Sequence, residues 1–124
     1  MKNSWFAGFA AQAVLLAVAA PVFGHHNTAA RYADERPVTI TGTVVQFRMI
    51  SPHSRLLVEV QGETGEAVIW DSETSSGPTL YRRGWRTDDL SPGDRVTVTG
   101  RPAVDGSASM QLIRVVAPGG KVLE

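Results

Sequence analysis

Five extended segments separated by turns most limit what this chain of 124 residues can fold into. The first, "VTITGTVV" at 38–45, alternates apolar side chains with threonines, which is the period of a half-buried strand. The apolar phase then moves to Val45, Phe47 and Met49, and this shift predicts a bend or bulge between Gly42 and Val45. A long bent strand of this kind can contribute to both sides of a small barrel.

A short helix interrupts the series of strands. Gly77 and Pro78 open it with proline at its first position, and Gly84 stands where a left-handed residue would end it. The order is therefore three strands, one helix and two strands, which is the order of an OB-fold. We predict an all-β protein, a five-stranded OB-like barrel, with an open meander or small sandwich as the alternative. The four later strands are predicted at 55–60, 67–71, 96–101 and 110–116.

Residues 1–24 have the layout of a secretory signal peptide. Lys2 precedes a long apolar run, and the small residues Val22 and Gly24 fit positions −3 and −1 of a cleavage site. We expect a signal helix that is removed between Gly24 and His25. The alternative is a retained membrane anchor, because a spanning helix needs only about 20 apolar residues. No basic stop-transfer cluster follows the run, so we expect no stable membrane anchor after cleavage.

The mature chain would contain a polar arm at 25–36 and the barrel domain at 37–124. Removing Lys2 from the twelve basic side chains leaves eleven, against twelve acidic ones, and the resulting charge of −1 gives no general attraction to nucleic acid. Cysteine is absent, so neither a disulfide nor a thiolate contributes. We therefore expect a periplasmic or secreted protein whose partner is a periplasmic protein or a small ligand, not nucleic acid.

Several segments resemble a family of small bacterial secreted proteins of unknown function. They are the His-His pair after the signal, "SPHSRLLVEV", "VIWDSE", "GPTLYRRGW" and "LSPGDRVTVTGRPA". Ser51 stands where that family usually has asparagine. The resemblance implies export and an OB-like barrel, and it brings no established activity. The residues that match the family pattern are His25, His26, His53, Trp70, Glu73, Arg82, Arg83, Gly84 and Trp85.

Histidines form the first candidate site. After cleavage, His25 offers an α-amino group and an imidazole, His26 adds a second imidazole, and His53 lies in a predicted turn that could face the arm. Copper, followed by zinc, favours such nitrogen donors. Asp71 and Glu73, near the end of the third predicted strand, are weaker candidate ligands and could instead orient an imidazole. The alternative is an exposed tail that binds metal without purpose and a His53 that is only a polar turn residue.

The basic aromatic segment "LYRRGWR" at 80–86 forms the second candidate site. Arg82 and Arg83 beside Trp85 could hold a phosphate, a carboxylate or a stacked ring of a ligand or partner. The alternative is a helix that caps the barrel, with Leu80 and Trp85 packed inward. In that case the arginines would pair with Asp88, Asp89 or Glu73.

No motif of an enzyme is present. The sequence contains no nucleophile elbow, no glycine-rich phosphate loop and no His-Glu-x-x-His pattern. A copper oxygenase built on an amino-terminal histidine is disfavoured because the chain is small for such a catalyst, and Trp70 is expected in the core. We therefore predict a non-enzymatic exported binding protein that holds a transition metal. The alternative is an OB-type interaction module that acts through the barrel face and the Arg/Trp segment.

Overall fold

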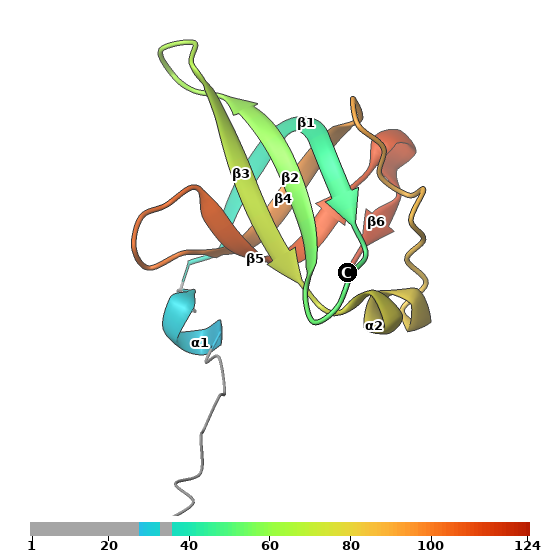
Figure 1. Ribbon diagram of the computed structural model, residues 1–124. Helices are drawn as coiled ribbons and strands as arrows, with labels where there is room; N and C mark the ends of the chain where they lie inside the picture. Colours follow the sequence, from blue (N-terminus) through green and yellow to red (C-terminus); the bar gives the residue numbers. More distant parts are fainter. Residues whose placement is uncertain (1–27, 33–35) are drawn as a thin grey trace, which may run out of the picture.

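The computed structural model describes residues 28–32 and 36–124 of the chain, and it shows a closed barrel with one helix across its lower end (Figure 1). Among these residues, no helix is long and apolar enough to cross a bilayer. The predicted signal peptide and the pair His25–His26 lie outside the described residues. The elements in chain order are α1 (Thr28–Arg31), β1 (Val38–Arg48), β2 (Ser54–Gln61), β3 (Ala67–Thr74), α2 (Gly77–Arg82), β4 (Arg95–Pro102), β5 (Ser109–Val116), η1 (Pro118–Gly120) and β6 (Val122–Leu123).

Strand pairing closes the sheet into the predicted OB-like barrel. The strands are ordered β3-β2-β1-β4-β5-β6, and a parallel pairing of β3 with β5 joins the two sides. The first strand is shared as expected, because its first half pairs with β4 and its second half with β2. The helix α2 lies between β3 and β4, so the all-β OB-like fold predicted from the sequence is confirmed. The short β6 adds to the edge of β5.

The bend in β1 lies where the pattern predicted it. The register with β2 shifts between Val44 and Gln46, so Val45 is the extra residue of a bulge. Phe47 therefore returns to the core, but Val45 points outward and is 43% exposed, which corrects its predicted core position. Gly42 lies just before the bulge, where a Cβ atom would come within 2.2 Å of the Glu59 carbonyl oxygen, so the bent strand requires glycine there.

The core fills the barrel and extends beneath it to α2. Val44, Leu56, Val58 and Val98 form its centre, each at most 2% exposed. The helix contributes Leu80, which is fully buried. At its end Gly84 has a φ of +95°, which is the left-handed conformation expected of a terminating glycine. The barrel interior is thus packed with side chains, and any site must lie on its outer surface or at its ends.

Candidate binding site around Glu73

A buried carboxylate lies at the end of β3. Glu73 is 7% exposed, although it points to the outer face of the sheet, since its neighbour Ser72 faces the core side. The Tyr32 hydroxyl donates a hydrogen bond of 2.7 Å to Glu73 Oε2. Tyr32 is itself 2% exposed and covers the carboxylate from the chain segment that follows α1. A buried carboxylate is costly unless donors and positive charges compensate it, so its other neighbours decide its role.

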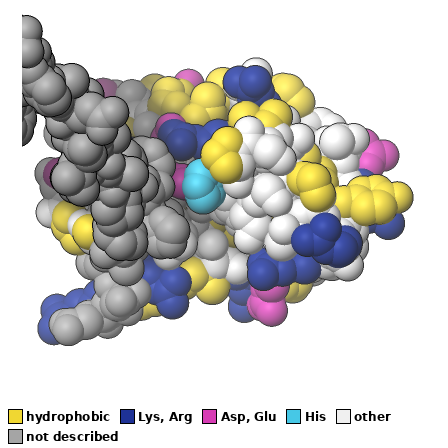
Figure 2. Space-filling view, turned by 60° about the horizontal axis from the view of Figure 1, so that its bottom comes forward, with side chains coloured by type: hydrophobic (Ala, Val, Ile, Leu, Met, Phe, Trp, Pro, Cys, Tyr) yellow, Lys and Arg dark blue, Asp and Glu magenta, His cyan; other side chains and the backbone are white. Residues whose placement is uncertain are grey.

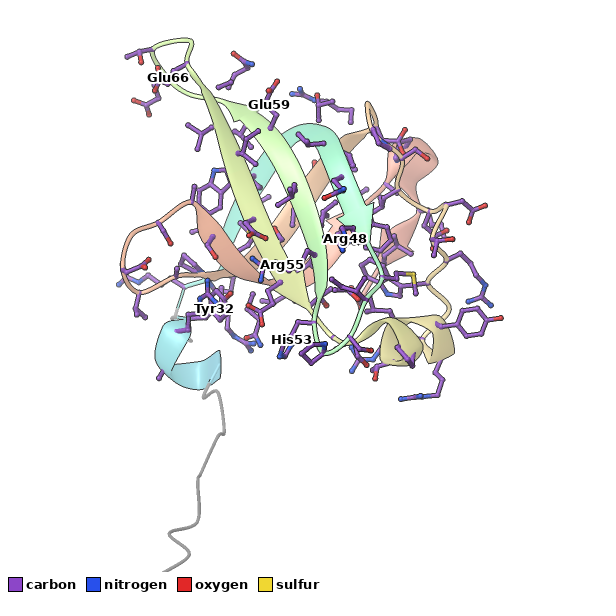
Figure 3. The ribbon with its side chains drawn as sticks, viewed as in Figure 1. Tyr32, Arg48, His53, Arg55, Glu59 and Glu66 are labelled. Carbon is purple, nitrogen blue, oxygen red and sulfur yellow. The ribbon has the colours of Figure 1, made fainter. Side chains whose placement is uncertain are left out.

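Three basic side chains surround Glu73. Arg31 Nη1 is 3.6 Å and Arg55 Nη1 3.7 Å from Oε2, while His53 Nδ1 is 3.4 Å from Oε1. Arg55 also donates to both carboxylate oxygens of Asp71. The negative charge of Glu73 is therefore compensated by side chains from the arm, from the β1–β2 turn and from β2. Figure 3 shows Tyr32, His53 and Arg55 near the lower end of β2 and β3.

The pKa values of two neighbours follow from this arrangement. Burial raises the pKa of Tyr32, and its hydrogen bond to Glu73 raises it further, because a phenolate would face a carboxylate. The hydrogen bond to Asp71 raises the pKa of Arg55, and the charges of Asp71 and Glu73 add to it. Tyr32 and Arg55 therefore both keep their protons at neutral and mildly alkaline pH, and both remain partners of Glu73 there.

Local pairing explains how these residues meet. The hairpin of β2 and β3 places Arg55 directly opposite Glu73, with Asp71 two residues away on the same face. The segment after α1 joins them by a bridge between Tyr32 and Ala103, supported by a hydrogen bond of 2.9 Å from the Val104 amide to the Arg31 carbonyl. The polar group thus forms where three distant segments of the chain converge.

His53 is one member of this set that faces both the protein and the solvent. It lies in the turn between β1 and β2, after a cis peptide bond between Ser51 and Pro52, and its side chain is 43% exposed. The nearby carboxylate of Glu73 favours the imidazole tautomer that carries its hydrogen on Nδ1. Nε2 is then the nitrogen with a lone pair, so His53 can accept a hydrogen bond or bind a metal ion.

A polar pocket of about 400 Å³ lies beside this group. Its walls come from the ends of β3, α2 and β4 and from the middle of β5, and its lining includes His53, Glu73, Arg83, Arg101, Gln111 and Glu124. Figure 2 shows this end of the molecule with the histidine at the surface, and further Lys and Arg side chains lie on the same face. The two arginines of the lining are matched in number by Glu73 and Glu124, so the pocket is polar without an excess of either charge.

The family of this fold can now be stated. A family described as "Family of unknown function (DUF6152)" matches residues 12–111. The chain belongs to the DUF6152 family. The expected resemblance to a family of unknown function is thereby confirmed, and no curated protein matches the chain.

One solved structure supports the fold of this DUF6152 protein, and a second match is weaker. The mitochondrial single-stranded DNA binding protein Rim1 of S. cerevisiae is 14% identical, with a TM-score of 0.53, covering 72% of this chain and all (100%) of its own. A small single-stranded DNA-binding protein of Streptomyces coelicolor is 20% identical, with a TM-score of 0.45, covering 72% of this chain and 97% of its own. At such identities the likeness to Rim1 shows an OB-like fold alone.

The predicted site residues of the DUF6152 protein separate in the structure. His53 and Glu73 are brought together, whereas His25 and His26 lie outside the described residues. Within 28–32 and 36–124 no group of three His, Cys, Asp or Glu side chains is placed to hold a metal ion. Trp70 packs against the core, as predicted.

The Arg/Trp segment divides between the interior and the surface. Trp85 is 1% exposed and its Nε1 donates to the Glu124 carbonyl oxygen, so its ring packs inward as the capping interpretation predicts. Within residues 28–32 and 36–124, Arg82 and Arg83 form none of the ion pairs with Asp88, Asp89 or Glu73 which that interpretation expected. Arg82 donates to the Thr79 hydroxyl, and Arg83 lines the pocket.

Sequence reasoning missed Arg55, Arg31 and Tyr32 as partners of Glu73. Arg55 carried a usable signal, because a hairpin between the predicted strands 55–60 and 67–71 places it opposite Glu73 once the register is counted from the intervening turn. Arg31 and Tyr32 carried none, since the contact of the arm with the barrel links residues 41 positions apart.

Proposed function

We propose that this DUF6152 protein is an exported, non-enzymatic protein that binds a transition metal ion, copper before zinc, with His25, His26 and His53. The contact between His53 Nδ1 and Glu73 Oε1 carries the proposal. A carboxylate that holds one imidazole nitrogen orients the ring and raises the basicity of the other nitrogen, and this arrangement recurs behind metal-binding histidines. The exposed Nε2 of His53 is thus prepared to ligate.

The position of the arm supports a shared site. Arg31 and Tyr32 contact Glu73, so the chain that precedes them starts beside His53. Thr28–Arg31 is the helix α1, which rises ~1.5 Å per residue, and His26 lies two residues before it, so an extended link would add at most ~7 Å. His25 and His26 are therefore tethered within reach of His53, which raises their effective concentration at its imidazole.

The chemistry of the donors points to copper. Cleavage after Gly24 would give His25 a free α-amino group, so the set would comprise one amine and three imidazoles. Nitrogen donors of this kind bind Cu(II) most strongly among the divalent first-row ions. Glu73 serves this site by orienting His53 and not as a ligand, because its oxygens already contact Tyr32, Arg31 and Arg55.

The outer face of the barrel does not favour nucleic acid as a partner. Core residues of β2 and β3 alternate with outward ones, and the outward set contains three acids and one arginine. Single-stranded DNA is usually held by aromatic platforms in a basic groove. The outward residues of β2 and β3 include no aromatic ring; they are Arg55, Leu57, Glu59, Gln61, Ala67, Ile69, Asp71 and Glu73.

Mass spectrometry of the exported protein, both intact and native, in a non-chelating buffer tests the proposal. The expected result is a chain that begins at His25 and binds one Cu(II). An otherwise identical chain with one alanine ahead of His25 should bind Cu(II) at least tenfold more weakly, since the terminal amine is displaced. His53→Gln should also weaken binding, with an unchanged melting temperature as the control for folding.

Two results would overturn this function. The first is a mature chain that retains residues 1–24 or begins elsewhere than His25. The second is equal copper affinity for the authentic and the extended chain, which would show that the terminal histidine does not ligate.

A further inference from the structure

We propose that the pocket between β3, α2 and β5 binds a small organic acid, with the carboxylate on Arg83 and the apolar part of the molecule against Leu112 and Ile113. This inference goes beyond metal binding and does not depend on it. It requires neither His25 nor His26, and every group that carries it lies within the described residues.

The pocket exists because two paired strands diverge. The parallel pairing of β3 with β5 ends at Glu73 and Gln111. Beyond this point β3 turns into α2, whereas β5 continues along β4, where Leu112 lies opposite Gly100. The wedge between them is the pocket of about 400 Å³, which is within the range of sites for small molecules.

The acidic groups of the lining are already compensated. Glu73 contacts the Tyr32 hydroxyl and three basic side chains. The Glu124 carboxylate is 3.6 Å from Arg114 Nε, and its backbone carbonyl accepts the Trp85 indole hydrogen. A negatively charged ligand would therefore meet little uncompensated negative charge in this wedge.

Of the two arginines in the lining, Arg83 has capacity for an anion. The Arg83 guanidinium has no hydrogen bond or ion pair within the part of the chain that the structure describes. Arg101 Nη1 donates a hydrogen bond of 3.2 Å to Gln111 Oε1. This bond uses the amide oxygen of Gln111 and leaves its NH₂ group as a donor. Two guanidinium groups and an amide thus line one wall, and His53 adds a further polar group at the rim.

Shape and polarity favour an organic acid over an inorganic anion. The planar guanidinium of Arg83 matches a carboxylate with two parallel hydrogen bonds. Leu112 is 8% and Ile113 36% exposed, so they give the pocket an apolar surface that phosphate cannot use. A carboxylate joined to a compact apolar group satisfies both walls.

Benzoate is a suitable probe, because it joins a carboxylate to a compact apolar ring. Metal-free, ¹⁵N-labelled mature protein would be titrated with sodium benzoate and, separately, with sodium phosphate at constant ionic strength. We expect saturable shifts of the amide resonances of His53, Gln111 and Ile113 with benzoate, and weaker effects with phosphate. Because metal is absent, a failure of this test leaves the copper proposal unaffected, and the reverse also holds.

Neighbouring arginines provide a matched control. Arg83→Ala should weaken benzoate binding at least tenfold, whereas Arg82→Ala, which removes the same charge from the adjacent position outside the pocket lining, should leave it within twofold. Arg83→Lys keeps the charge without the planar fork and should fall between them. Melting temperatures of the three variants verify folding.

Three outcomes would overturn the proposal. Equal losses in the Arg82 and Arg83 variants would indicate a general charge effect. Saturable binding of phosphate but not of benzoate would show that the apolar wall does not contribute to ligand binding. Unsaturable shifts with both anions would mean that the wedge holds no specific ligand.

Discussion

Replacing Glu73 by glutamine is expected to lower the free energy of unfolding by about 2–4 kcal/mol. Glutamine keeps the volume of the side chain and one acceptor for the Tyr32 hydroxyl, so the change isolates the charge. A hydrogen bond to a carboxylate stabilises a protein by about 1 kcal/mol more than a neutral one. The remaining loss comes from the three basic neighbours, Arg31, His53 and Arg55, each a third or more exposed and worth ~0.2–1 kcal/mol.

Urea unfolding at pH 7, followed by tryptophan fluorescence, measures this loss directly. Glu63→Gln is the matched control, since Glu63 is an exposed carboxylate of the β2–β3 turn and its loss should change stability by less than about 0.5 kcal/mol. If Glu73→Gln and Glu63→Gln unfold at the same urea concentration, the burial and compensation of Glu73 do not contribute to stability, and the reasoning on the site is wrong.

Three other substitutions test separate parts of the structure. Trp85→Ala should cost about 3–5 kcal/mol, because the ring is 1% exposed, and calorimetry would measure the fall in melting temperature. Gly42→Ala should cost roughly 1–3 kcal/mol, as its Cβ would lie 2.2 Å from the Glu59 carbonyl oxygen and force β1 to shift. Asp89→Asn should remove the most stability above the unfolded pKa of Asp89, which is 3.8. Burial raises the folded pKa, but hydrogen bonds from Lys121 and the Arg86 amide lower it more. The stabilisation by Asp89 is thus present at neutral pH and disappears as pH falls through the lowered pKa of the folded state, which urea titrations between pH 2 and 7 would reveal.

Each of these outcomes can fail in its own way. A Trp85 variant that melts with the wild type would mean that the indole does not stabilise the lower end of the barrel. An unchanged Gly42 variant would contradict the close approach at the bulge. A loss from Asp89→Asn that is as large at pH 2 as at pH 7 would exclude the ion pair with Lys121 as its cause.

The order of strands and the helix could be predicted from the sequence because both are encoded locally. Alternating side chains specify a strand, and proline at the start with glycine after the end specifies a short helix, without reference to the rest of the chain. Even the bulge left a local trace in the shifted phase after Gly42. Val45 was misplaced because a bulge leaves one residue unpaired, and the pattern does not reveal which one.

The candidate site was only partly predictable, for a physical reason. His53 and Glu73 were visible as residue types of the right chemistry, but their contact depends on how a turn lies against the end of another strand. The burial of Glu73 depends on Tyr32, which is 41 residues away and docks from the arm. By itself, the sequence determined the segments and the turns that join them. The closed barrel and the docked arm decided that a carboxylate on an outer face would be buried, and that two diverging strands would leave a polar pocket beside it.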